Sequence, residues 1–318
     1  MLHAFALNDG RLTRIDFEEG GLCSDRPVWI DAVAPTEGER EWLEQTCRLT
    51  LPKPEHLRDI EASARFYEHD DTLHLRSDFL SGTESHSRSV AVAFALKDET
   101  LISIHAEDLP IFRLLRIKKT AESGRIEDCR DVLVDLYGMD VEFSADALER
   151  VYAELSNVSQ HVLGKPLSDK QAGAVLANIA HAEHVNGRIR RNVMDTQRAL
   201  SFLVRNKRLT TGQIAEVGQI QHDIESLDGH TAFLFDKINF LMDATVGFIN
   251  INQNKIVRLF SVASVALLPP TLIASIYGMN FAVMPELNWK LGYPLALLLM
   301  LLSVAGPFWI FHRKGWLK

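Results

Sequence analysis

The sequence has 318 residues, of which 47% are hydrophobic and 24% are charged, and its formal net charge at pH 7 is −8. The charge is uneven, because the residues from Lys255 onward hold six Lys and Arg against one Asp or Glu, whereas the first 254 residues hold 28 against 41. An acidic body of this size argues against a nucleic-acid partner, whose phosphates require a basic face, and is compatible with cations as ligands.

Residues 1–125 are predicted to form a mixed α/β domain. Short apolar or alternating runs, separated by turn signals, indicate strands at Leu2–Leu7, Leu12–Phe17, Val28–Val33, Thr72–Phe79, Val90–Leu96 and Leu101–His105. Helices are expected at Thr36–Cys47 and Pro54–Ala62. The first begins with a capping box, since Thr36 precedes Glu39 by three residues.

Residues 126–210 are predicted to form a helical hairpin. Apolar residues from Leu133 to Val162 recur at helical spacing until the sequence "GKP" at 164–166, and a second helix is expected from Ser168 to Asn206. The tetrapeptide "YGMD" (137–140) falls in the first of these helices, in a polar amphipathic stretch between Asp135 and Glu142, and is interpreted as an ordinary helix turn.

After the turn "RLTTGQ" (208–213) no strong helix stop occurs before Pro269. This stretch of 57 residues would be about 85 Å long as a helix, which is typical of a stalk rather than of a compact core. Residues 211–277 are therefore predicted to form a stalk helix that continues into a membrane span at about 257–277.

Two apolar runs near the C-terminus predict a pair of transmembrane helices. No Asp, Glu, Lys or Arg occurs between Arg258 and Glu286, or between Lys290 and His312, and each run is close to the ~20 residues that cross a bilayer. The second span is expected at 291–311, followed by a basic tail at 312–318. Basic residues lie at the outer ends of the pair, so both termini are expected in the cytoplasm and the loop 278–290 outside.

A polar stripe continues from the stalk into the first span. Steps of three, four and seven residues connect the stripe positions Asp243, Asn250, Asn254, Val257, Ser261, Ser264, Leu268, Thr271 and Ser275. Polar groups at membrane depth face protein or water rather than lipid, which favours a pore lining. Alternatively, the hydroxyl groups bond to their own helix or pack between helices. In the pore interpretation Val257, Phe260 and Leu268 form a hydrophobic gate that closes by dewetting. Two helices cannot enclose a pore, so several copies would surround it.

The stripe leads to the loop "YGMNFAVMPEL" (277–287). The Asn280 side chain offers a carbonyl acceptor, and a ring of such groups would hold a hydrated cation through its water shell, which suits Mg²⁺ because it sheds water reluctantly. Glu286 supplies the single negative charge of the loop and would concentrate cations there; an ordinary exposed acid is the alternative interpretation.

This loop resembles the signature of the CorA magnesium and cobalt transporters, which have a Gly-Met-Asn triplet followed by Met-Pro-Glu-Leu. Other segments resemble the enterobacterial branch of the family: "DIEASARFYEHDDTLHL" (59–75), "MDTQRALSFLVR" (194–205), "GFININQNKI" (247–256), "SVALLPPTLIASIYGMN" (264–280) and "RKGWLK" (313–318). The resemblance covers nearly the whole chain.

The resemblance implies a homopentameric, funnel-shaped channel in the bacterial inner membrane, with an α+β cytoplasmic domain, a stalk helix and two C-terminal transmembrane helices. Gly278, Met279 and Asn280 would select hydrated Mg²⁺, and the stripe would line the pore. Influx of Mg²⁺, and also of Co²⁺ and Ni²⁺, would follow the membrane potential without ATP. Intracellular Mg²⁺ at acidic subunit interfaces would close the channel. No other cofactor, no catalytic residue and no nucleic-acid partner are expected.

Two alternatives remain open at this stage. A proton-coupled Zn²⁺ transporter would share the architecture, but Met279 and "MPEL" (284–287) favour Mg²⁺. A cytoplasmic sensor that the hairpin only anchors to the membrane would need neither the polar stripe nor Asn280.

Overall fold

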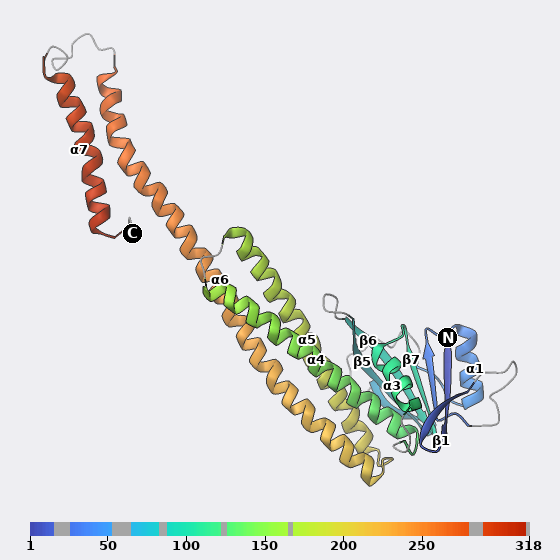
Figure 1. Ribbon diagram of the computed structural model, residues 1–318. Helices are drawn as coiled ribbons and strands as arrows, with labels where there is room; N and C mark the ends of the chain where they lie inside the picture. Colours follow the sequence, from blue (N-terminus) through green and yellow to red (C-terminus); the bar gives the residue numbers. More distant parts are fainter. Residues whose placement is uncertain are drawn as a thin grey trace. The chain divides into compact units, whose positions relative to one another are not determined.

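The computed structural model describes residues 1–15, 26–52, 65–82, 88–121, 126–164, 168–279 and 289–315 (Figure 1). The expected helix Pro54–Ala62, and also Asn280 and Glu286, lie outside these residues. The chain divides into two compact units. The first comprises Met1–Leu163 and Val175–Leu241, and the second comprises Gly164–Ala174 and Met242–Lys318.

A seven-stranded sheet organises the N-terminal part of the first unit. Its strands, in chain order, are β1 (Leu2–Asn8), β2 (Arg11–Ile15), β3 (Trp29–Val33), β4 (Phe66–His69), β5 (Thr72–Ser81), β6 (Arg88–Lys97) and β7 (Thr100–His105). The strand order is β2-β1-β3-β7-β6-β5-β4. All neighbours are antiparallel except β3 and β7. The six expected strands are confirmed, whereas β4 was not expected.

Alternating side chains give the sheet two different buried faces. On one face, Leu43 of helix α1 (Glu37–Cys47) joins a cluster of small and branched residues that includes Ile30 and Ile102. The capping box of α1 is present as expected, with the Glu39 amide donating to Thr36 Oγ1 at 3.3 Å. The other face carries aromatic rings, which pack within 5.1–6.3 Å of one another: Phe5, Trp29, Phe79, Phe94, Phe112 and Tyr137.

Five further helices complete the described chain. They are α3 (Pro110–Ala121), α4 (Cys129–Gly164), α5 (Asp169–Arg205), α6 (Thr211–Tyr277) and α7 (Gly292–Arg313). The long helices α4 and α5 match the expected hairpin, whereas α3, which contributes Phe112 to the aromatic face, was not expected. Helix α6 is continuous through Pro269 and Pro270.

The "YGMD" turn of α4 has a packing role that its interpretation as an ordinary helix turn did not include. The segment is helical, as expected, but Tyr137 has no exposed surface and Asp140 is only 1% exposed. Tyr137 hydrogen-bonds with Ser77 of β5 (2.9 Å), and Gly138 lies so close to Ile220 of α6 that a Cβ atom there would be 3.4 Å from its side chain. The tetrapeptide is thus the place where α4 packs against both the sheet and α6.

Two buried carboxylates complete the hydrogen bonding of β5. Strand β4 pairs only with Thr72–Leu75, and farther along β5 the amide groups of Asp78 and Leu80 donate to side chains instead. The Asp78 amide donates to Asp195 Oδ2 of α5 (3.0 Å), and the Leu80 amide donates to Asp140 Oδ1 of α4 (3.4 Å). Buried amides require such partners, so these carboxylates stand in for a neighbouring strand and fix both helices to the sheet.

The two carboxylates differ in how their charge is balanced. Asp195 contacts the guanidinium of Arg65, which also bonds to Asp78. Asp140 accepts from the uncharged donors Asn192 Nδ2 (2.8 Å) and Thr196 Oγ1 (3.2 Å). Burial therefore raises the pKa of the Asp140 carboxyl to about 7, and these hydrogen bonds offset only part of the rise.

This carboxyl is expected to make stability depend on pH. An unfolded Asp has a pKa of about 3.9, so between that pH and about 7 the folded chain holds a proton that the unfolded chain has lost. The free energy of unfolding then falls as the pH rises through this range. Asp140→Asn should remove the part of this pH dependence that comes from the Asp140 carboxyl. The quantity to compare is the melting temperature of the wild type minus that of the variant. We expect this difference to be roughly 5 °C lower at pH 8 than at pH 5.5. An equal difference at both pH values would contradict this assignment.

Candidate functional site

The candidate site lies along the C-terminal half of α6 in the second unit. Two helices, α6 and α7, contain windows long and apolar enough to span a membrane, and only 11% and 6% of these windows is buried within the described chain. A core helix of a soluble protein would be mostly buried. Low burial together with apolar composition is what a lipid-facing hairpin requires.

The polar stripe is exposed along its whole length. All nine stripe positions from Asp243 to Ser275 are solvent-accessible in the single chain. The apolar side chains of the proposed gate are among the most exposed, with Val257 at 62%, Phe260 at 72% and Leu268 at 66%. The structure therefore brings the stripe residues onto one face of one continuous helix.

The opposite face of this part of α6 is covered. Val262 and Ala266 are 5% and 4% exposed, and in α7 Ala296 is 7% exposed. Ile273 and Tyr277 continue the covered face of α6 and are half-buried. At ~100° per residue, this face and the stripe point in roughly opposite directions. Small residues at the covered face allow close helix packing, so α7 is the natural cover and the stripe is left free for another partner.

Two stripe hydroxyls bond to their own helix. Ser261 Oγ donates to the Val257 carbonyl (2.8 Å), and Thr271 Oγ1 donates to the Leu267 carbonyl (2.7 Å). This is the local bonding that the alternative interpretation of the stripe expected. Because each hydroxyl hydrogen is donated to a carbonyl of the helix, the hydroxyl oxygen can only accept hydrogen bonds from groups outside the helix. An acceptor surface suits water that is bound to a cation.

A glycine lies where α6 ends, close to the backbone of the preceding turn. The Gly278 amide donates to the carbonyls of Ala274 (2.9 Å) and Ser275 (3.2 Å), and a Cβ atom at this position would be only 3.1 Å from the Ala274 oxygen. Met279 follows and is 46% exposed. The triplet thus begins in a tight helix end that a larger residue would crowd.

Basic and aromatic residues mark the other end of the spans. Lys255 and Arg258 are exposed on α6, and at the end of α7 the Arg313 guanidinium lies 5.3 Å from the centre of the Trp309 ring. Arg and Trp together are typical of a membrane–water interface, which places the end of the apolar run near Trp309.

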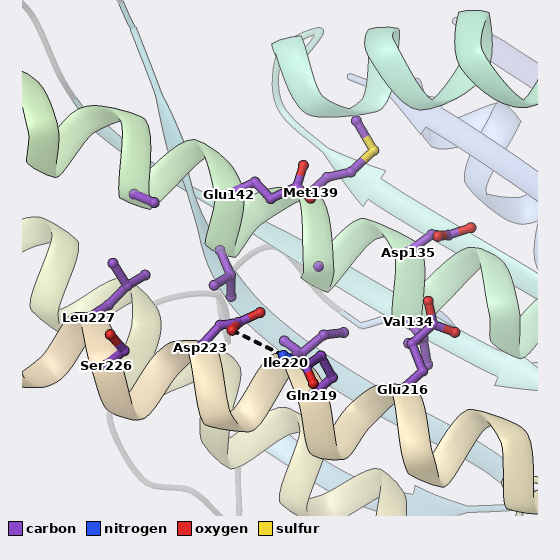
Figure 2. Close-up of a pocket in the computed structure, with 13 residues that line it drawn as sticks. Val134, Asp135, Met139, Glu142, Glu216, Gln219, Ile220, Asp223, Ser226 and Leu227 are labelled. Carbon is purple, nitrogen blue, oxygen red and sulfur yellow. Dashed lines mark hydrogen bonds between the residues drawn. The ribbon is translucent and has the colours of Figure 1, made fainter.

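The first unit contains an acidic groove that was not predicted from the sequence. Helices α4 and α6 line a cavity of about 460 Å³. Four carboxylate residues line it, Asp135 and Glu142 from α4 and Glu216 and Asp223 from α6, as Figure 2 shows. Gln219 Nε2 donates to Asp223 Oδ1 at 3.4 Å. Among the described residues, no three His, Cys, Asp or Glu side chains are placed to hold a metal ion within one chain.

A signal for this groove was present in the sequence. In each helix the two acids are seven residues apart, which puts them on one face. What the sequence lacked was the pairing of α4 with α6, which brings Gly138 next to the side chain of Ile220.

Comparisons with known proteins agree with this architecture. The family model described as "CorA-like Mg2+ transporter protein" matches residues 24–313. The chain belongs to the CorA family. Proteins named "Magnesium transport protein CorA" from Haemophilus influenzae and Escherichia coli K12 are 45% and 43% identical, each over the full length of both chains. CorA membership confirms the family that the loop and the other quoted segments indicated.

Solved structures show the same fold at low sequence identity. "The complete structure of CorA magnesium transporter from Methanocaldococcus jannaschii" matches with a TM-score of 0.79 at 20% identity and covers 99% of this chain and 98% of that one. The cytoplasmic domain of ZntB from Vibrio parahaemolyticus matches with a TM-score of 0.62 at 14% identity. The match covers 78% of this chain and 97% of that domain. The CorA fold, with an α+β domain, a long helix and two apolar C-terminal helices, is therefore that of a membrane protein.

Proposed function

We propose that this chain is a Mg²⁺ channel of the bacterial inner membrane, which also passes Co²⁺, with both termini in the cytoplasm. The observation that supports the proposal is the polar stripe of α6, which runs into the apolar segment 257–277 and is exposed in the single chain on the face opposite the covered side chains Val262 and Ala266. A membrane anchor gains nothing from such a face, because lipid offers no donor to the outward lone pairs of these hydroxyl oxygens. The names of its full-length CorA relatives, which are magnesium transport proteins, support Mg²⁺ as the ion.

The pore would be formed by five copies of the chain around one axis. A single α6 leaves its stripe uncovered, and copies of one helix related by cyclic symmetry would turn their stripes toward a common centre. The near-heptad spacing of the stripe suits packing of identical helices about an axis. In this arrangement α7 would lie outside α6 and face the lipid with its exposed leucines.

The outer selectivity site would be the Gly278–Met279–Asn280 triplet. Gly278 allows the tight end of α6, and the Asn280 carbonyls of five chains would accept hydrogen bonds from the water shell of the ion. Glu286 would raise the local cation concentration at the pore mouth. Influx of the cation would be driven by the inside-negative potential and would need no ATP.

The gate would be formed by rings of Val257, Phe260 and Leu268. Five apolar side chains at one level can exclude water without closing completely, and this blocks a hydrated ion. The acceptor oxygens of Ser261 and Thr271 lie on the same stripe and would hold the ion's water when the pore is wet.

The acidic groove between α4 and α6 is our candidate for the cytoplasmic Mg²⁺ brake. Its two acids on α6, Glu216 and Asp223, would share the ion with a neighbouring subunit, so that bound Mg²⁺ holds the subunits together and keeps the pore closed. Loss of the ion would leave repelling carboxylates at the interface and favour opening.

Flux through the purified protein tests this function. Proteoliposomes containing the full chain and a Mg²⁺-sensitive dye should take up Mg²⁺ when an inside-negative potential is imposed, and Mg²⁺ preloaded inside should slow the uptake. Zn²⁺ uptake that needs a proton gradient, without Mg²⁺ uptake, would instead assign the chain to zinc transport. Absence of any cation flux would leave the anchored sensor as the better account.

A further inference from the structure

A second cavity in the first unit has a chemistry opposite to that of the acidic groove. It has a volume of about 820 Å³ and is lined by the C-terminal part of α5 and by Phe66 of β4. Two neighbouring rows on α5 contribute its other lining residues, each row spaced by four: Gln197, Ser201 and Arg205 in one, and Arg198, Phe202 and Asn206 in the other. Its volume is in the range of small-molecule sites.

The charged residues that line this cavity in the described part of the chain are two arginines. Arg198 and Arg205 are both exposed, and neither forms an ion pair or a hydrogen bond with any residue in the described part of the chain. The charge of Arg198 lowers the pKa of the buried Asp195 carboxyl without direct contact, and that carboxylate is already bonded to Arg65. No described Asp or Glu lines the cavity, although acidic residues outnumber basic ones, 42 to 34, in the chain.

The floor of the cavity is aromatic. The rings of Phe66 and Phe202 lie 5.9 Å apart at 35°, and Phe66 is 8% exposed. The neighbouring polar groups are partly occupied: Ser201 Oγ donates to the Gln197 carbonyl (2.8 Å), and Asn206 Nδ2 donates to the Phe202 carbonyl (2.9 Å). A ligand would therefore find its charge partners in the two arginines and its apolar contact on the rings.

These groups are those that recognise a phosphorylated planar molecule. Guanidinium groups bind phosphate through paired, charge-assisted hydrogen bonds. The two arginines are two helical turns apart, about 10 Å along the axis, and their long side chains can reach adjacent phosphate groups. A flat heterocyclic ring would stack on or against the phenylalanine rings.

We propose that this cavity binds a nucleoside diphosphate or a closely related nucleotide, with its phosphates on Arg198 and Arg205 and its base over Phe66 and Phe202. The site would regulate the protein rather than hydrolyse the nucleotide, because the sequence contains no glycine-rich phosphate loop and none of the described lining residues is a carboxylate or histidine that could activate water. It stands on residues that the proposed ion pathway does not use.

Binding of a fluorescent ADP analogue to the detergent-solubilised full chain tests the proposal. We expect saturable binding, weakened at least tenfold in Arg198→Gln/Arg205→Gln. The matched control is Arg191→Gln, which removes an exposed arginine on the same helix, seven residues before Arg198 and outside the cavity lining, and should bind like the wild type. Circular dichroism melting of each variant would show that the fold is kept.

Competition with pyrophosphate separates the two halves of the site. In the wild type, ADP should displace the fluorescent analogue at a lower concentration than pyrophosphate does. Phe202→Leu should reduce this difference while leaving the binding of pyrophosphate unchanged. Equal competition by the two ligands in the wild type would overturn the nucleotide assignment. No saturable binding at millimolar ADP, or equal loss in the Arg191→Gln control, would overturn the site itself.

Discussion

Replacement of Asn280 by alanine is expected to reduce potential-driven Mg²⁺ uptake to the level of protein-free vesicles. The change removes one hydrogen-bond acceptor for the hydrated ion from every subunit. Five such bonds at ~1 kcal/mol each amount to about 5 kcal/mol, which is more than a thousandfold in ion binding. Dye-reported uptake in proteoliposomes, at equal protein density, measures the effect.

The matched control for this variant is Asn288→Ala, in the same loop but outside the triplet. Its uptake should remain within about twofold of the wild type, since the proposed selectivity site does not include this amide. Undiminished uptake in Asn280→Ala would remove this residue from the selectivity site while leaving the pore lining of α6 open to the next test.

Replacement of Ser264 by tryptophan is expected to block uptake completely. Ser264 is a small, exposed residue of the stripe, between the Val257 and Leu268 levels of the proposed gate. One tryptophan from each of five subunits would bring ~150–250 Å² of ring surface per chain into the pore axis, where no space for a hydrated ion would remain. We expect at least a hundredfold loss of flux with unchanged membrane insertion.

The comparison for Ser264→Trp is Leu298→Trp, on the exposed apolar face of α7. Tryptophan facing lipid is tolerated, so flux should be close to that of the wild type. Equal loss in both variants would indicate general damage to the hairpin. Full flux in Ser264→Trp would show that the stripe does not line the pathway and would favour helix packing as its purpose.

Local signals accounted for most of the architecture. Alternating apolar residues located six of the seven strands, and the Thr36–Glu39 capping box located the start of α1. Strand β4 was missed because its four residues "FYEH" bury only Phe66, so no alternation is visible. Helix α3 was missed because its sequence is rich in Lys and Arg and shows no clear stop, although its buried side includes Ile111, Phe112 and Leu115.

Features that depend on distant pairs could not be predicted. Asp140 looks like a surface acid in its own segment. Its burial follows from Asn192 and Thr196, which are 52 and 56 residues away in the sequence. The nucleotide cavity likewise needs Phe66 and α5 together. By contrast, the stripe and the triplet were visible because they lie along one helix and one loop, where sequence spacing alone sets the geometry.

The two carboxylates that replace a strand beside β5 make the sheet a reporter of helix docking. The amide hydrogens of Asp78 and Leu80 are protected by side chains of α5 and α4, whereas other amides of β5 are protected by pairing with β6 or with β4. In hydrogen–deuterium exchange, these two sites should therefore exchange as soon as the helices lift away, long before the sheet itself opens. Any signal that loosens α4 and α5 from the sheet would appear first at these two amides.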